Sequence, residues 1–323
     1  MIKKDDFIDV YVKLKQRGLK FLTTKLNPRQ LERTKSAFND DQLFASHWWI
    51  IPEVRRRWNK LITGDADIEY EDYLLTQYLN HRSDWSMVSF GSGVCSHEIN
   101  LAESGAFSKI VCVDIAEKLL SRAESIAKEK GLNEMHFIAQ DLYKIHFEEA
   151  AFDIVFFHAS LHHFADIEAL ITNKILKILK PNGLVIINEY VGANRMQFPK
   201  HQVKAINDAI KLIPQEYRQR YGSNTIKTSV SGPGLIRMYL ADPSECVESE
   251  NILPLMRKYF KTIEEKPYGG NLLMYALKDI SHHFQNTNSE QMDTLNQLFE
   301  LEDAYLKKYQ SDFVFGLYQK SEL

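Results

Sequence analysis

Short apolar segments alternate with single amphipathic segments from about residue 86 to residue 190, and this alternation is the strongest constraint on the fold. The apolar segments are rich in Val, Ile and Phe, as strands buried on both faces are. Connections between parallel strands of one sheet are right-handed crossovers, usually through a helix. The pattern therefore predicts a parallel sheet with helices on both faces. The five predicted strands read MVSF, KIVCVD, MHFIAQD, FDIVFFHAS and GLVIINEY.

Two of the connecting segments show the helical period clearly. In residues 116–132 small and branched apolar residues recur on one face, and Gly131 is a natural helix stop. In residues 166–180 isoleucine and leucine recur at spacings of three and four. Pro181, Asn182 and Gly183 then predict a turn before the fifth strand.

The sequence as a whole divides into four predicted regions, the sheet core and three regions that flank it. Residues 1–80 read as helices and are interpreted as a cap or lid, and residues 81–190 form the core. Residues 191–250 interrupt the alternation and are expected to form a substrate cap, while residues 251–323 add two late strands. The prediction is an α/β, Rossmann-like, doubly wound sheet of seven strands, mostly parallel with one antiparallel strand. It carries a helical N-terminal extension and an insertion after the fifth strand.

Charge and composition narrow the functional classes. The formal net charge is −3 and the apolar content is 44%, which suits a packed core and gives no basic field for nucleic acid. No apolar run approaches the roughly 18 residues of a membrane span. Three cysteines without metal-site spacing indicate neither a metal site nor a disulfide framework. We expect a cytoplasmic protein without metal, nucleic-acid partner or membrane partner, and leave monomer and homodimer open.

A glycine turn follows the first predicted strand, in the stretch MVSFGSGVCSHEINLAE. Ligands of open parallel sheets collect beyond the carboxyl ends of the strands. Gly91 and Gly93 would let the backbone approach such a ligand without a Cβ clash. By itself the turn is also compatible with an ordinary strand-to-helix connection.

Aspartates close the next two predicted strands. Asp114 lies 23 residues after Gly91, where a carboxylate can accept hydrogen bonds from two ribose hydroxyls. Asp141 ends the third strand, where it can accept from an adenine amine beside apolar neighbours. The three strand ends together predict a pocket for one adenosyl group. A nicotinamide-dependent oxidoreductase is the first alternative, although the sixth position of its G-x-G-x-x-G motif is Ser96 here.

These segments resemble the class I S-adenosylmethionine-dependent methyltransferases. The upstream segment WWIIPEVRRRWNKLITGD is also similar to N-terminal segments of bacterial members that modify small molecules or glycans. The similar motifs are SFGSGVC, VCVD, AQDL, FDIVFFHASLHHF and ILKPNGLVIINEY. The resemblance implies that S-adenosyl-L-methionine is the cofactor and that its methyl group is transferred by direct in-line displacement. It also implies a set of cofactor-binding residues: Ser89, Gly91, Ser92, Gly93, Asp114, Ile115, Asp141, Leu142 and His158.

Two residues depart from the family's usual motif. Ser89 stands where the family usually has an acidic residue, and Cys95 stands where it has a third glycine. A serine accepts only weakly from the cofactor's ammonium group, so that contact is expected to come from elsewhere. The same departures leave a second alternative, a binding protein that keeps the fold without catalysis.

Candidate catalytic residues follow the fourth and fifth predicted strands. His162 and His163 lie in FHASLHHF, and imidazole titrates near neutrality, as a general base requires. Glu189 and Tyr190 end the fifth strand and could orient the acceptor or act as base. For the histidines the structural alternatives are a helix cap and packing on the cofactor. For Glu189 and Tyr190 they are a salt bridge at the strand end and a packed ring.

The acceptor is expected to be a small molecule. Enzymes that methylate DNA bases carry an Asn/Asp-Pro-Pro-aromatic motif after the fourth strand, where this chain reads HASLHHF. The helical N-terminal region and the insertion are expected to build the acceptor pocket. Trp48, Trp49 and Arg56 are its candidate substrate or lid residues, and a solvated helix face over a buried tryptophan is the alternative.

Overall fold

The computed structural model describes residues 3, 6 and 47–321. Within residues 1–80, which the sequence predicts to be helical, the segments FIDVYVKLKQRGLKFL and LERTKSAF fall outside the described residues. The remaining N-terminal prediction is confirmed by helices α4 (Pro52–Thr63) and α5 (Tyr70–Gln77). In the described part of the chain, no helix is both long and apolar enough to cross a bilayer.

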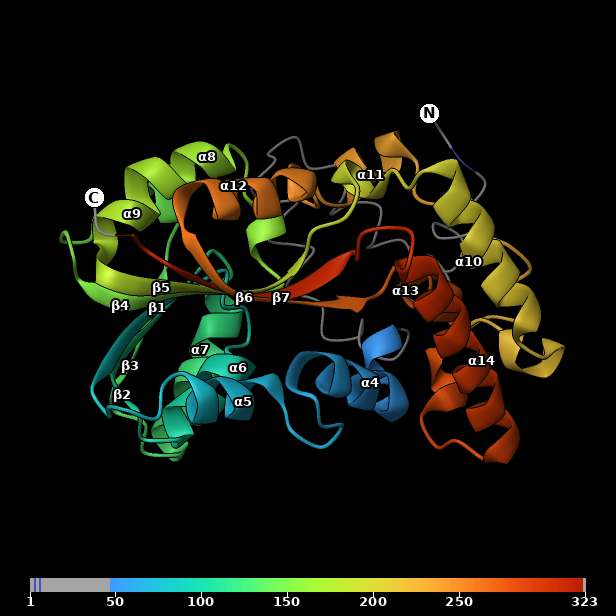
Figure 1. The fold of residues 1–323 in the computed structure, drawn as a ribbon, viewed down its shortest axis with the longest axis horizontal. Coiled ribbons are helices and arrows are strands. Elements are labelled where there is room, and N and C mark those ends of the chain that lie inside the picture. Colours follow the sequence, from blue (N-terminus) through green and yellow to red (C-terminus); the bar gives the residue numbers. More distant parts are fainter. Residues whose placement is uncertain (1–2, 4–5, 7–46, 322–323) are drawn as a thin grey trace. The chain divides into compact units, whose positions relative to one another are not determined.

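Seven strands form one sheet in the order β3-β2-β1-β4-β5-β7-β6, and β7 runs antiparallel, as the sequence predicted (Figure 1). From β1 the strand order runs through β2 to β3 on one side and continues with β4 and β5 on the other, so the switch point of the sheet lies beside β1. The strands are β1 (Trp85–Phe90), β2 (Phe107–Asp114), β3 (Met135–Ala139), β4 (Phe152–His158), β5 (Leu179–Tyr190), β6 (Lys261–Gly269) and β7 (Phe313–Gln319).

The predicted turn before the fifth strand is a bulge within β5. Asn182 has a φ of 58°, and the pairing with β4 shifts register between Leu179 and Leu184. The strand begins four residues earlier than the predicted GLVIINEY, because Leu179 already pairs with β4 before the bulge and the pairing resumes at Leu184 after it.

Helices cover both faces of the sheet (Figure 1). On one face lie α5, α6 (Ser96–Glu103) and α7 (Glu117–Glu129), and on the other α8 (Ile167–Leu170), α9 (Leu176–Ile178) and α12 (Ile252–Tyr259). A π-helical turn, Ile171–Ile175, joins α8 to α9. The other helices are α10 (Lys200–Leu212), α11 (Leu235–Ala241), α13 (Leu273–Leu277) and α14 (Ser289–Leu306).

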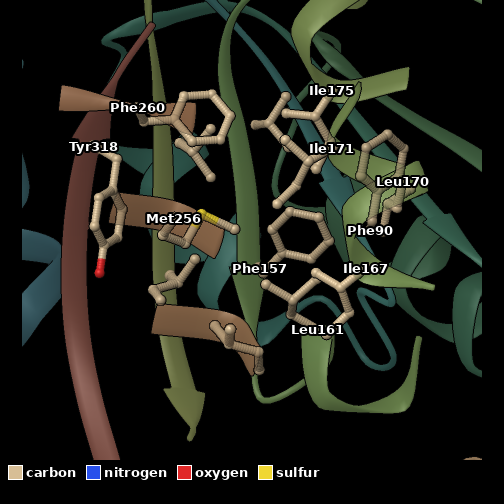
Figure 2. Close-up of a cluster of buried hydrophobic side chains, with 14 of the residues drawn as sticks. Phe90, Phe157, Leu161, Ile167, Leu170, Ile171, Ile175, Met256, Phe260 and Tyr318 are labelled. Atoms are coloured by element: carbon tan, nitrogen blue, oxygen red, sulfur yellow. The ribbon is translucent and has the colours of Figure 1, made fainter. Parts of the chain in front are cut away.

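A buried cluster fills the space between the sheet and the helices α8 and α12. Figure 2 shows Phe157 at its centre, with Met256 from α12 on one side and isoleucines of the α8 region on the other. Phe157 is fully buried, so its truncation to alanine would cost about 3–5 kcal/mol of unfolding free energy. This core fixes the positions of β4 and β5 and of the residues that follow them.

The chain divides into two compact units. One comprises residues 62–191, 247–266 and 314–323 and holds most of the sheet. The other comprises residues 1–61, 192–246 and 267–313 and includes α10, α13 and α14. The sequence placed its boundaries at residues 80, 190 and 250, and that functional division stays a prediction.

Candidate functional site

The glycine turn leaves β1 in a conformation that favours glycine. Gly91 has a φ of +71°, and its amide donates to the carbonyl of Val113 at 2.8 Å. A Cβ at Gly91 would lie 2.7 Å from the Cβ of Ser160. Gly93 has a φ of +53°, yet no atom lies within 4 Å of the Cβ that it lacks. The turn is thus closed towards β4 at Gly91 and open at Gly93.

Cys95, the residue in place of the third glycine, keeps the backbone conformation of a glycine. Its φ is 54° and it precedes the first residue of α6. Left-handed backbone costs a non-glycine residue about 1–2 kcal/mol. The buried thiol lies 3.8 Å from the carbonyl oxygen of Gly93. The chain therefore keeps the motif's backbone while its third glycine is replaced.

Asp114 at the end of β2 is bound to the same turn. Its Oδ2 accepts from the amide of Gly93 at 2.8 Å, and its Oδ1 accepts from the amide of Ala116 at 2.7 Å. Each carboxylate oxygen has a second acceptor site, so hydroxyl groups of a ligand can bind beside these amides. The half-buried Ile115 follows directly.

Asp141 follows β3 and caps a short 3-10 helix, Leu142–Lys144, by accepting from the amide of Tyr143 at 3.1 Å. The cap orients the carboxylate at the carboxyl edge of the sheet. Leu142 is 4% exposed and its side chain packs in the core cluster. A ligand at this position would therefore meet the backbone of Leu142 rather than its side chain.

Ser89 donates its hydroxyl to Glu98 Oε1 at 2.5 Å, and both residues are buried. Burial raises the pKa of Glu98, and the Ser89 hydrogen bond partly offsets this. Ser92 closes the turn by donating its hydroxyl to the carbonyl of Ser89 at 3.2 Å.

Glu98 was not among the predicted site residues. Its signal was a carboxylate on the apolar face of a helix, three and four residues before the buried Leu101 and Ala102.

His158, the last residue of β4, lies in a stack of rings. Its ring centroid is 3.5 Å from that of His97 on α6, and its Nδ1 is 2.9 Å from the hydroxyl of Tyr70 on α5. Burial and the neighbouring histidines hold the pKa of His158 well below its ordinary value, so it is neutral at physiological pH. The Nδ1 of His97 in turn donates to Glu71 at 2.5 Å. Tyr70, Glu71 and His97 were not among the predicted site residues.

One carboxylate organises the turn that follows β4. Glu189 is fully buried, and its Oε1 accepts from the amides of Ser160 at 2.6 Å and Leu161 at 2.5 Å. Its Oε2 lies 2.7 Å from Nδ1 of His162. The Ser160 hydroxyl donates to the carbonyl of Phe90 at 2.7 Å, which joins this turn to the glycine turn.

The structure thus brings the other three candidate catalytic residues close to His162. His162 is 7% exposed, and its ring centroid lies 4.3 Å from that of the half-buried His163 and 6.2 Å from that of the buried Tyr190. The hydrogen bond with Glu189 fixes the proton on Nδ1 and directs Nε2 away from Glu189. An imidazole held in this way can accept a proton through Nε2.

The three candidate lid residues belong to the other compact unit. Trp48 is 2% exposed and packs edge-on against Trp58 with centroids 4.5 Å apart. Trp49 is 40% exposed and stacks on His47, and the exposed Arg56 lies 3.6 Å from Glu53 one turn away on α4. Their role in binding an acceptor stays a prediction.

The geometry suits an adenosyl ligand. Gly93 leaves open space at the turn, and carboxylates lie at the last residue of β2 and two residues beyond β3, where hydroxyl and amine donors would meet acceptors. The profile of the protein family described as "Methyltransferase domain" matches residues 82–267, which is more than half of the chain.

Part of this chain is similar in sequence to a known protein. An uncharacterized methyltransferase, YcgJ of Bacillus subtilis (strain 168), is 26% identical over an alignment of 132 residues that covers 37% of this chain. The chain spans about half of that relative, namely 51% of its length.

Two solved structures resemble the chain in fold. Phosphoethanolamine N-methyltransferase 2 of Haemonchus contortus, in complex with S-adenosyl-L-methionine, aligns with a TM-score of 0.50 and 16% identity, over 90% of this chain and 57% of that one. A putative sarcosine dimethylglycine methyltransferase of Galdieria sulphuraria aligns with a TM-score of 0.44 and 16% identity, over 78% and 85%.

Proposed function

Because the chain belongs to the class I S-adenosylmethionine-dependent methyltransferases, we propose that it methylates an oxygen or nitrogen atom of a small molecule. The acceptor would be a secondary metabolite or a sugar unit. The observation that carries the proposal is the buried Glu189–His162 pair, because it places a candidate proton acceptor in the turn that is hydrogen-bonded to the glycine turn.

We assign the cofactor to the three strand ends. The turn at Gly91 and Gly93 would receive the methionine moiety, Asp114 the ribose hydroxyls and Asp141 the adenine amine. The other proposed cofactor-binding residues contribute through the glycine turn or through their backbone, and they are Ser89, Ser92, Ile115 and Leu142. His158 would form one wall of the cofactor site. When bound, S-adenosyl-L-methionine supplies a methyl group on a positively charged sulfur.

His162 is the proposed general base. With S-adenosyl-L-methionine bound, a lone pair of the acceptor would form the new bond to the methyl carbon while the carbon–sulfur bond breaks, and the electron pair of the broken bond would stay on sulfur. The acceptor's proton moves to Nε2 of His162. Glu189 then stabilises the resulting imidazolium through the hydrogen bond at Nδ1. His163 and Tyr190 flank this imidazole and would orient the acceptor.

Alignment contributes more to the rate than proton removal. Holding acceptor and methyl group in line is worth about 7–11 kcal/mol of the barrier. A general base gives about 10²- to 10⁴-fold, or some 3–5 kcal/mol. Loss of His162 would therefore slow the enzyme without abolishing transfer.

The acceptor class follows from charge and from the residues after β4. The net charge of −3 gives no basic field for a nucleic acid, and the segment HASLHHF lacks the prolines that stack a flipped base. We assign the acceptor pocket to the N-terminal helices and to residues 191–250, with Trp48, Trp49 and Arg56 as its lid. A cytoplasmic location fits such a substrate.

Transfer of a labelled methyl group tests the acceptor class. The purified protein is incubated with methyl-labelled S-adenosyl-L-methionine and a cell extract divided into small molecules, nucleic acid and protein. We expect label in the small-molecule fraction, and much less with His162→Ala. Label confined to nucleic acid or protein would contradict the proposal.

A further inference from the structure

Three carboxylates lie around the glycine turn and α6, and they differ in what balances their charge. Glu71 accepts a hydrogen bond from His97, and Asp114 accepts from two backbone amides. Glu98 is 2% exposed and accepts from the neutral hydroxyl of Ser89. Within residues 47–321, no ion pair joins Glu98 to a cationic side chain.

A buried carboxylate without a cation is unfavourable in an isolated protein. Burial is the main cause of the raised pKa of Glu98, and the charge of Glu71 adds to it, whereas Ser89 and His97 oppose it. Such a group is stabilised when a ligand brings a positive charge to it. Among the described residues Glu98 thus lacks a cationic partner, and a cationic group of a ligand would supply one.

The position of Glu98 identifies the part of the ligand. Glu98 lies in the first turn of α6, and its side chain returns to Ser89, next to the last residue of β1. The ribose and adenine are assigned to the ends of β2 and β3. The methionine moiety is the part left for the end of β1.

We propose that the carboxylate of Glu98 binds the ammonium group of the methionine moiety of S-adenosyl-L-methionine, with Ser89 fixing its orientation. This assignment rests on the proposed function. The carboxylate would then stand on α6 instead of at the end of β1, where Ser89 supplies the hydroxyl.

The ammonium is a better partner for Glu98 than the sulfonium. The sulfonium loses its charge as the methyl group leaves, so a carboxylate against it would stabilise the ground state more than the transition state. The ammonium keeps its charge throughout the reaction. A contact there strengthens binding without raising the barrier.

Calorimetric titration with two ligands tests the assignment. S-adenosylhomocysteine carries the ammonium group, whereas 5′-methylthioadenosine has the same adenosine and sulfur without it. In Glu98→Gln we expect the affinity for S-adenosylhomocysteine to fall about tenfold to a hundredfold, and the affinity for 5′-methylthioadenosine to stay within twofold. The double variant Ser89→Asp/Glu98→Ser returns a carboxylate to the pair and should regain most of the lost affinity.

The outcomes separate this assignment from the proposed function. Wild-type binding of S-adenosylhomocysteine with unchanged affinity in Glu98→Gln would overturn the role of Glu98 alone. An equal loss for both ligands would also overturn it, because the effect would then be structural. Absence of wild-type binding at tens of micromolar would overturn the proposed function together with this assignment.

Discussion

The carboxylate of Glu189 and the imidazole of His162 form a hydrogen-bonded pair, with Oε2 2.7 Å from Nδ1. The same carboxylate holds the backbone of the turn through the amides of Ser160 and Leu161. Glu189 therefore links two tasks, because it shapes the turn and sets the proton position on the imidazole. We therefore propose Glu189 as a positioning residue for His162 rather than as a base itself.

Substitution of His162 and Glu189 tests this pair. His162→Ala should lower kcat by about 10²- to 10⁴-fold and leave the affinity for S-adenosylhomocysteine within twofold. Glu189→Gln keeps an oxygen for the turn, but its amide donates towards Nδ1 and favours the wrong tautomer, so we expect a loss of about tenfold or more. Steady-state kinetics of the double variant should match His162→Ala alone. Fully additive losses would show that Glu189 does not act through His162.

Alanine substitution of the two glycines separates crowding from backbone strain. Gly93→Ala meets no neighbour and should cost about 1–2 kcal/mol of unfolding free energy for its positive φ. Gly91→Ala bears the same strain and also meets the Cβ of Ser160 at 2.7 Å, which adds about 1–3 kcal/mol. Denaturant unfolding measures both. Adding Ser160→Gly should recover part of the loss in Gly91→Ala but none in Gly93→Ala, and equal losses in the two alanine variants would contradict the close approach.

Substitution of Cys95, the residue before α6, by glycine or by alanine tests whether its left-handed backbone is strained. Because its φ is 54°, Cys95→Gly should be more stable than Cys95→Ala by about 1 kcal/mol, although both lose the thiol. Paired thermal or denaturant unfolding gives the difference directly. An alanine variant as stable as the glycine variant would mean that the left-handed backbone carries no strain.

Asp312 predicts a pH dependence of stability. Burial raises its pKa to about 7, with an opposing hydrogen bond from Gln202 and a further rise from Glu302. The folded protein then holds a proton that the unfolded chain releases near pH 4, so this stabilisation is full below pH 4 and is lost as the pH rises through 7. Relative to Asp312→Asn, the wild type should lose about 3 kcal/mol of unfolding free energy between pH 5 and pH 8. Denaturant unfolding at both pH values measures it, and a constant difference would contradict the raised pKa.

The sequence predicted the sheet because strand periodicity and glycine turns are local signals. Asp114 was found at the end of its strand for the same reason, whereas the predicted third strand was two residues too long, because β3 ends at Ala139 and Asp141 caps the 3-10 helix that follows. Glu98 was missed because its significance lies in the approach of its side chain to Ser89, nine residues away. The ring stack of Tyr70, His97 and His158 needs three elements to meet, and no spacing in the sequence encodes it.

The turn that follows β4 shows a mixed outcome. Its histidines and Glu189 could be selected by residue type at two neighbouring strand ends. The division of labour could not, because it depends on which carboxylate oxygen accepts from which donor. The residue type of Cys95 also gave no sign of its left-handed backbone, because that conformation is typical of the glycine that the family has at this position and not of cysteine.

Calorimetric titration of the wild-type protein with S-adenosylhomocysteine tests the central claim most directly. The account predicts binding of one ligand per chain at low micromolar concentration or tighter, weakened by Asp114→Asn. No heat of binding at tens of micromolar would contradict an adenosyl pocket at the three strand ends.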